Sequence, residues 1–308
     1  MLPIGPTHTN NSLALLDAAS GGKSDPKEIQ MWAVIPIKHV NEAKHRLASI
    51  LSPGERQALF EAMFEDVLTA ALAVPTLEKV VVATVCPTAC EIAKRHGASA
   101  LSTGQDEGQT AAVANTAAAL ESKGVEGLLM LPGDIPLVTT EEIQTVLAVH
   151  GNSPAMTIVP ARDELGSNCI ALSPPTATPL RFGTNSYFPH LDTARRLGLE
   201  LHTPKLPGIG LDIDTPEDLK KLCRQPTRTR AQEYLQGRRI VQRLSDFELR
   251  LTQSAPKKAA EVGEDIFAQC WRVPLDSRAL SPHCREVEGA LKETLDDFST
   301  LTKPGKNR

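Results

Sequence analysis

The feature that most constrains the fold is the stretch 128–137, Leu-Leu-Met-Leu-Pro-Gly-Asp-Ile-Pro-Leu. It begins as a continuous apolar run, which predicts a strand buried on both faces of a parallel sheet. The run stops at Pro132-Gly133 and places one carboxylate, Asp134, at the C-terminal end of that strand. Open α/β sheets bind ligands at this edge, because the loops that leave it line the crevice. The stretch therefore predicts a ligand site near Asp134. The alternative is that Asp134 caps a helix after Pro136.

Apolar runs and amphipathic segments alternate on both sides of this stretch. Strands are expected near 32–37, 80–85, 100–102, 156–160 and 169–172. Helices are expected from residue 53 onward, at 89–96, before Gly124 and at 140–149. Strands and helices that alternate at this spacing predict an α/β fold with three layers and a mainly parallel sheet. The connections are expected to be right-handed crossovers.

The two ends of the chain differ in character from its middle. Residues 1–30 are rich in Pro, Gly, Ser, Thr and Asn and predict a flexible N-terminal extension. Residues 31–223 carry the alternating pattern and predict the main domain. Residues 224–308 mix charges of both signs with sparse apolar positions. They predict a helical or partly disordered C-terminal extension that packs on the main domain or pairs with another chain.

Composition excludes several classes of function. A formal charge of −4 gives no basic field for broad nucleic-acid binding, and 4% aromatic residues cannot form a base-stacking platform. No apolar run approaches the length that spans a bilayer, so no membrane association is expected. The six cysteines are scattered and form no C-x-x-C pair, which indicates free thiols in a reducing compartment. We therefore expect a cytoplasmic protein.

Asp212 and Asp214 form a second acidic signal. In an extended segment their side chains project to the same side, since side chains alternate with period two. Two such carboxylates repel each other unless a cation or solvent separates them, and Mg²⁺ prefers oxygen ligands of this kind. The alternative is that Asp214 or Thr215 caps a helix that begins at Pro216. Both interpretations can hold together.

Lys38, Lys44 and Arg46 form a basic signal after the first predicted strand. They are expected at the same sheet edge as Asp134, where they can supply donors and positive charge to phosphates. The segment lacks the pattern G-x-x-x-x-G-K-[ST] and is therefore not a P-loop. An ordinary solvated basic face is the alternative.

Five motifs, in this order, carry a resemblance to a known family. They are Lys38 with Ala43-Lys44-His45-Arg46-Leu47; Pro132-Gly133-Asp134-Ile135-Pro136-Leu137; Gly166-Ser167-Asn168; Phe182-Gly183 with Ser186 and His190; and Gly210-Leu211-Asp212-Ile213-Asp214-Thr215-Pro216-Glu217-Asp218-Leu219. This set resembles the CofC/FbiD family of guanylyltransferases of coenzyme F420 biosynthesis, over about residues 32–223.

The resemblance implies a nucleotidyltransferase of the glycosyltransferase-A-like α/β fold. Such enzymes join GTP to 2-phospho-L-lactate, phosphoenolpyruvate or 3-phospho-D-glycerate and release pyrophosphate. The implied partners are these substrates and the transferase that consumes the product. Asp134, Asp212 and Asp214 would hold Mg²⁺, and Asp134 and Lys38 would act in catalysis.

The resemblance also assigns the substrate-binding residues. Lys44 and Arg46 would contact phosphates, while Asn168, Gly183 and Ser186 would surround the acceptor. Gly108 and Thr110 belong to a loop expected near the guanine or the acceptor. There this chain has Gly108-Gln109-Thr110 in place of the family's usual Gly-Leu-Asn.

The roles of His190 and Cys169 and the choice among rival functions are less clearly indicated by the sequence. A lone histidine near a helix start, His190, is more often structural than catalytic. Cys169 has no histidine partner for nucleophilic work and is expected to be a buried strand residue. The rival functions are a nucleotidyltransferase of the same fold that acts on a sugar phosphate or a molybdopterin, and a non-catalytic scaffold.

Overall fold

The computed structural model describes residues 29–40, 43–102, 109–183 and 185–254. These residues form a seven-stranded sheet in the order β3-β2-β1-β4-β6-β5-β7. The strands are β1 (Met31–Pro36), β2 (Leu77–Ala83), β3 (Ser99–Leu101), β4 (Gly127–Met130), β5 (Ala155–Pro160), β6 (Ser167–Ser173) and β7 (Glu200–His202). Only β6 runs antiparallel to its neighbours, β4 and β5. The predicted α/β fold with a mainly parallel sheet is confirmed.

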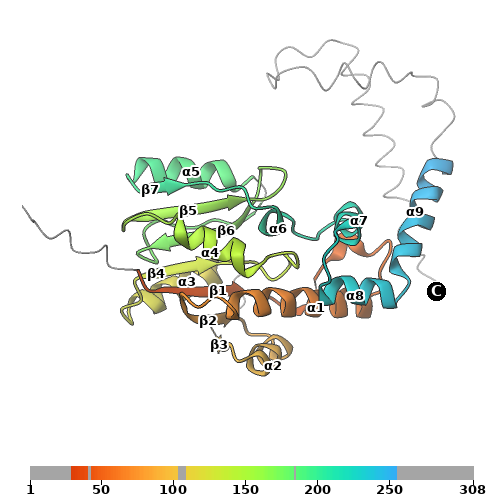
Figure 1. The fold of residues 1–308 in the computed structure, drawn as a ribbon, viewed down its shortest axis with the longest axis horizontal. Coiled ribbons are helices and arrows are strands. Elements are labelled where there is room, and N and C mark those ends of the chain that lie inside the picture. The colour runs from red at the N-terminus through yellow and green to blue at the C-terminus, as the bar shows by residue number, and fades with distance from the viewer. Residues whose placement is uncertain (1–28, 41–42, 103–108, 184, 255–308) are drawn as a thin grey trace, which may run out of the picture. The chain divides into compact units, whose positions relative to one another are not determined.

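Helices cover both faces of the sheet (Figure 1). Successive residues of β1 show why, because Ala33 and Ile35 pack in one core cluster and Val34 in another on the opposite face. One face is covered by α1 (Pro53–Leu72), α2 (Pro87–His96) and α4 (Thr140–Ala148). The other face is covered by α3 (Gln109–Glu121) and α5 (Tyr187–Arg196). The three predicted layers are therefore present.

Local signals in the sequence set the helix ends. Ser52 and Glu55 form a capping box at the start of α1, with Pro53 in its first turn. Gly97 ends α2 with a φ of 86°, a left-handed conformation that glycine adopts without a Cβ penalty. Thr139 caps α4, so Asp134 does not cap that helix. The carboxylate of Asp134 is thus not used in capping α4 and can take part in other contacts at the end of β4.

Three short helical elements follow strands β1 and β7, and they carry or adjoin the residues of the predicted site. A 3₁₀ turn, η2 (His45–Leu47), follows β1. Helix α6 (Pro207–Gly210) follows β7, and α7 (Pro216–Arg224) comes after it. Thr215 and Asp218 form a capping box at the start of α7, which confirms Thr215 as the helix cap.

The compact unit extends beyond the expected boundary at Cys223 and ends at Glu248. Helix α8 (Arg230–Gly237) packs on α1. The carboxylate of Asp66 in α1 accepts hydrogen bonds from Arg230 N at 2.9 Å and Ala231 N at 3.0 Å, the first amides of α8. Helix α9 (Ile240–Ser254) begins within the same unit. Thr229 is the N-cap of α8 and forms a capping box with Gln232, so local residues and the buried Asp66 carboxylate together satisfy the first amides of the helix.

Within the described part of the chain, no helix combines the length and apolarity needed to cross a bilayer. The cysteines described are free thiols, and Cys169 is fully buried in β6, as expected. Burial raises the pKa of the Cys169 thiol, so it stays protonated and is not a nucleophile.

Candidate active site

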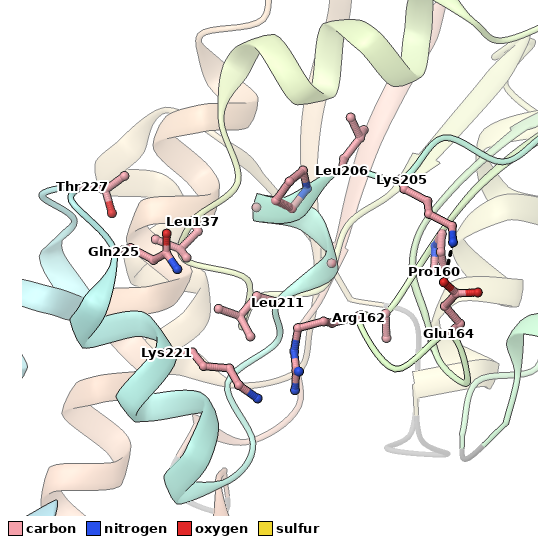
Figure 2. Close-up of a pocket in the computed structure, with 14 residues that line it drawn as sticks. Leu137, Pro160, Arg162, Glu164, Lys205, Leu206, Leu211, Lys221, Gln225 and Thr227 are labelled. Carbon is pink, nitrogen blue, oxygen red and sulfur yellow. Dashed lines mark hydrogen bonds and ion pairs between the residues drawn. The ribbon is translucent and has the colours of Figure 1, made fainter. Parts of the chain in front are cut away.

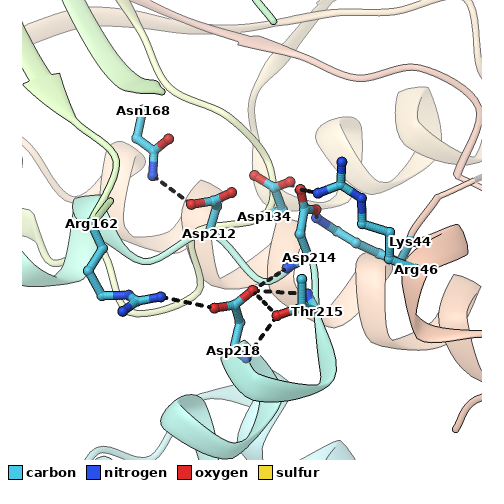
Figure 3. Close-up of polar contacts among 9 residues, drawn as sticks. All are labelled: Lys44, Arg46, Asp134, Arg162, Asn168, Asp212, Asp214, Thr215 and Asp218. Carbon is cyan, nitrogen blue, oxygen red and sulfur yellow. Dashed lines mark hydrogen bonds and ion pairs between the residues drawn. The ribbon is translucent and has the colours of Figure 1, made fainter. Parts of the chain in front are cut away.

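Two acidic segments far apart in the sequence lie side by side at one sheet edge. The amide of Ile213 donates a hydrogen bond to the carbonyl oxygen of Asp134 at 3.1 Å. The Ile213 side chain is fully buried, so Asp212 and Asp214 flank it and project away from the core. The three carboxylates, which we call the acid cluster, therefore gather where β4 ends (Figure 3).

Lys44 holds two members of the acid cluster together. Its Nζ lies 2.5 Å from Asp134 Oδ2 and 2.7 Å from Asp214 Oδ1, and its side chain is only 4% exposed. Burial alone would lower the pKa of Lys44, but the two carboxylates outweigh it and the pKa is raised. Burial likewise opposes ionisation of Asp214, yet the Lys44 charge holds its pKa below the usual range. Lys44 is therefore a charged ammonium between two carboxylates.

Asp212 has an amide partner instead of a cation. Asn168 Nδ2 donates to Asp212 Oδ1 at 3.1 Å and to the carbonyl oxygen of Ile209 at 3.0 Å. Burial raises the pKa of Asp212, and the negative charges of Asp134 and Asp214 raise it further. Asp212 thus has an amide as its partner, and no cation of the described residues forms an ion pair with it.

The charges of the acid cluster do not balance. Arg46 Nη1 lies 3.9 Å from Asp214, with a side chain 74% exposed, so three carboxylates face one buried and one solvated cation. No group of three His, Cys, Asp or Glu side chains within the described residues is arranged to hold a metal ion. The predicted three-carboxylate magnesium site stays a prediction: the three carboxylates lie together, and the Lys44 ammonium contacts two of them. The excess negative charge and the oxygen donors nevertheless fit a divalent cation.

A second network fixes the backbone that carries Asp214. Asp218 Oδ2 accepts hydrogen bonds from Thr215 N at 2.9 Å and from the Thr215 hydroxyl at 2.6 Å. Its other oxygen accepts from Arg162 Nη2 at 3.4 Å (Figure 3). The capping box of α7 therefore also positions the acid cluster.

Ser186, which was predicted near the acceptor, belongs to a separate network that begins next to Asn168. We call Ser167, Ser186 and His190 the serine–histidine cluster. His190 Nε2 accepts a hydrogen bond from Arg181 N at 3.0 Å, so the proton of the neutral ring is on Nδ1 and is donated to Ser167 Oγ at 3.0 Å. Ser186 Oγ also donates to Ser167 Oγ, at 3.1 Å. Ser167 accepts both bonds, so its own hydroxyl hydrogen is not used in either of them.

The loop before α5 connects to the start of α3. Phe182 N donates to Thr110 Oγ1 at 3.1 Å, so Thr110 supports the residue next to Gly183. Gly183 has a φ of 145°, a conformation that favours glycine. Thr110, Gly183 and Ser186 thus belong to one connected region.

The remaining predicted residues differ in their outcome. Lys38 follows β1 and is exposed, and no described residue forms a hydrogen bond or ion pair with it. Gly108 lies outside the described residues. Three residues were missed as site residues from sequence: Ser167, Arg162 and Asp218. The capping-box spacing was a usable signal for Asp218, whereas the contact of Arg162 depends on the fold.

A pocket of about 470 Å³ lies beside the acid cluster (Figure 2). Its apolar wall includes Leu137, Leu206 and Leu211, and Arg162 and Lys221 lie at one end. Leu211 is adjacent in sequence to Asp212, but no acid of the cluster lines the pocket. The chemistry indicated by the acids is therefore outside this pocket.

Residues 31–252 match the model of a protein family described as "Guanylyl transferase CofC like". The match covers most of the chain and includes every site residue discussed above. The chain belongs to this CofC-like family.

Relatives in this CofC-like family share about a third of their residues with the chain. A protein of Rubrobacter xylanophilus named phosphoenolpyruvate guanylyltransferase is 34% identical over 194 residues, which cover 63% of this chain and 94% of the relative. A 2-phospho-L-lactate guanylyltransferase of Methanothermobacter thermautotrophicus is 32% identical over 211 residues, which cover 68% of this chain and 91% of the relative. The relatives thus match nearly their whole length.

A solved structure supports the fold. A protein of Desulfovibrio desulfuricans described as a nucleotide-diphospho-sugar transferase superposes with a TM-score of 0.57. It is 18% identical and covers 71% of this chain and 98% of its own. This similarity confirms the predicted nucleotidyltransferase fold and carries no conclusion about the substrate.

The buried His190 gives a prediction for stability against pH. Burial lowers the pKa of His190 to about 4, whereas a histidine in the unfolded chain has a pKa of about 6.5. Between these values the unfolded chain binds a proton that the native protein does not, so stability is full above 6.5 and falls as the pH drops towards 4. His190 is expected to contribute up to about 3 kcal/mol of this loss.

Denaturant unfolding at pH 7, 6, 5 and 4 tests this expectation. The variant His190→Gln should show a weaker dependence of the unfolding free energy on pH than the wild type. His150, whose pKa burial also lowers to about 4, and carboxylates with a lowered pKa, such as Glu55, contribute to the dependence that remains. An unchanged slope in His190→Gln would show that this imidazole is not held neutral.

Proposed function

We propose that this chain is a guanylyltransferase that joins GTP to a small phosphorylated carboxylic acid and releases pyrophosphate, in coenzyme F420 biosynthesis. The observation that carries the proposal is the acid cluster, gathered with Lys44 at the C-terminal sheet edge of a CofC-like chain. The names of the relatives support the reaction class and the two kinds of substrate.

The reaction needs little acid–base chemistry from the protein. A phosphate oxygen of the acceptor is already anionic, and it forms a bond to the α-phosphorus of GTP while the bond to the leaving pyrophosphate breaks. The barrier comes from repulsion between two polyanions and from charge that develops on the transferring and leaving groups. Lys44 and Arg46 lie close to the acid cluster, and their positive charge would reduce this repulsion and stabilise the developing negative charge.

Mg²⁺ is the cofactor that we propose for this site. Asp134, Asp212 and Asp214 would hold it, because their oxygens suit a hard cation and their charges exceed those of Lys44 and Arg46. When bound, the ion would neutralise charge on the phosphate oxygens. Lys38, exposed at the same sheet edge, is proposed to contact phosphate.

The serine–histidine cluster is proposed to bind the acceptor. The Ser167 hydroxyl accepts two hydrogen bonds and keeps its hydrogen for a carboxylate or phosphate oxygen. Asn168 follows it directly and links this region to Asp212. The acceptor would therefore lie between the cluster and the acids, with its phosphate near the α-phosphorus of GTP.

Pyrophosphate release tests the proposed reaction. The chain is incubated with GTP and Mg²⁺, and with 2-phospho-L-lactate, phosphoenolpyruvate or 3-phospho-D-glycerate in parallel reactions. The transferase that consumes the product is added to remove it. We expect release that depends on one of the three acceptors and stops when EDTA removes Mg²⁺. Release without any acceptor, or only with sugar phosphates, would reject the proposal in favour of a different nucleotidyltransferase.

A further inference from the structure

Lys44 lies where a cation would join Asp134 and Asp214. We propose that Lys44 is a built-in counter-ion that excludes free divalent metal ions from these two carboxylates until a nucleotide arrives. The phosphates of the nucleotide then attract the Lys44 ammonium away, and the carboxylates become available to the metal ion that enters with the nucleotide. This inference rests on the proposed function for the identity of the ligand.

The geometry supports direct competition. The ammonium of Lys44 contacts one oxygen of Asp134 and one of Asp214, and its side chain is almost fully buried. A metal ion between the same two carboxylates would occupy the same space and would be repelled by the ammonium charge. The third acid, Asp212, has Asn168 as its partner instead. Lys44 therefore lies where it would compete with a metal ion for Asp134 and Asp214.

The local backbone suits a side chain that moves while its loop stays in place. The carbonyl oxygen of Lys44 accepts a hydrogen bond from Leu47 N at 2.9 Å, and the Leu47 side chain is fully buried. The backbone of Lys44 adopts the left-handed region, with a φ of 60°, which is uncommon outside glycine and persists only when its surroundings fix it. Four methylene groups separate this fixed backbone from the ammonium. The proposal therefore assigns the movement of the charge to this stem and not to the backbone.

Two different roles of Lys44 predict different effects of its removal on metal binding. Loss of a residue that binds phosphate would weaken nucleotide binding. Loss of a competing cation would in addition strengthen the binding of a bare metal ion. Only the second effect is specific to competition, so metal binding without nucleotide is the informative quantity.

Mn²⁺ binding, followed by the electron paramagnetic resonance signal of the free ion, tests the inference on the full chain. We expect weak binding by the wild type alone and at least tenfold tighter binding by Lys44→Met. A non-hydrolysable GTP analogue should tighten Mn²⁺ binding strongly in the wild type and much less in the variant. Equal or weaker Mn²⁺ binding by Lys44→Met without nucleotide would overturn the inference.

Two further variants keep the test decisive. Lys44→Gln removes the charge but keeps a hydrogen-bond donor, and it should also bind bare Mn²⁺ more tightly than the wild type. It replaces Lys44→Met in the test if Lys44→Met does not fold. Lys79→Met removes a lysine at the start of β2, at the opposite sheet edge, and should bind Mn²⁺ like the wild type. Tighter binding in Lys79→Met as well would show a general charge effect and contradict a specific role of Lys44.

The outcome separates this inference from the proposed function. If Lys44→Met binds Mn²⁺ no tighter while the wild type transfers guanylyl groups, only the role of Lys44 as competitor fails. If Lys44→Met binds Mn²⁺ more tightly but no acceptor supports pyrophosphate release, the substrate assignment fails and the competition stands.

Discussion

Replacing Asp134 by asparagine is expected to lower the turnover number by about a hundredfold to a thousandfold, the loss typical when one electrostatic contact to a transition state is removed. Asparagine has nearly the same shape, so packing around β4 is preserved. The change removes a carboxylate that is bound to Lys44 at 2.5 Å and lies beside the other two acids. Steady-state measurement of pyrophosphate release at saturating GTP and acceptor gives the turnover number.

A matched control separates this effect from a general loss of charge. Asp192 lies on α5 with a side chain 72% exposed, and Asp192→Asn should retain wild-type turnover. Circular dichroism should show the same helix content for both variants. Wild-type turnover in Asp134→Asn would remove this carboxylate from the catalytic machinery.

Ending the chain after Cys223 is expected to prevent cooperative folding. The truncation removes α8 and α9, whose residues Leu235, Ile240 and Leu244 belong to the main core. Three buried aliphatic side chains contribute roughly 6 kcal/mol by burial, which is comparable with the total stability of a typical domain. The carboxylate of Asp66 would also lose its two amide donors and remain buried without partners.

A chain that ends after Ser254 is the control for this truncation. It keeps α8 and α9 and should unfold in a single cooperative transition when heated or titrated with urea. If the chain that ends after Cys223 unfolds with the same cooperativity and midpoint, α8 and α9 are dispensable for the main core.

Much of the site could be predicted because its residues lie at positions that a simple pattern defines. Asp134 follows a continuous apolar run, and such runs end at the edge of a parallel sheet where ligands bind. Asp212 and Asp214 are two residues apart around a buried isoleucine, so they share a side in an extended segment. The period of a strand and the direction of a parallel sheet were sufficient for these residues.

The contacts of Lys44 could not be predicted in the same way. It was expected to bind phosphate, and the structure shows it between two carboxylates. Its backbone is left-handed, a conformation that the sequence does not indicate for lysine. The partners of Lys44 are 90 and 170 residues away, so only the tertiary fold determines the contact.

The position of α8 and the role of His190 were also beyond sequence patterns. Helix α8 has a local cap, Thr229, but its first two amides also bind Asp66, more than 160 residues earlier, and the sequence gave no sign of this partner. His190 was expected to be structural or at the surface, and it is buried where its imidazole fixes the hydrogen bonds of Ser167. Both features depend on side chains that meet only after folding.

A crystal structure with Mn²⁺ and a non-hydrolysable GTP analogue tests the central claim most directly, since anomalous scattering locates the metal ion. We expect a metal ion bound to Asp134 and to at least one of Asp212 and Asp214, with the Lys44 ammonium moved to a phosphate oxygen. A metal ion bound away from all three acids, with Lys44 still joining Asp134 and Asp214, would contradict it.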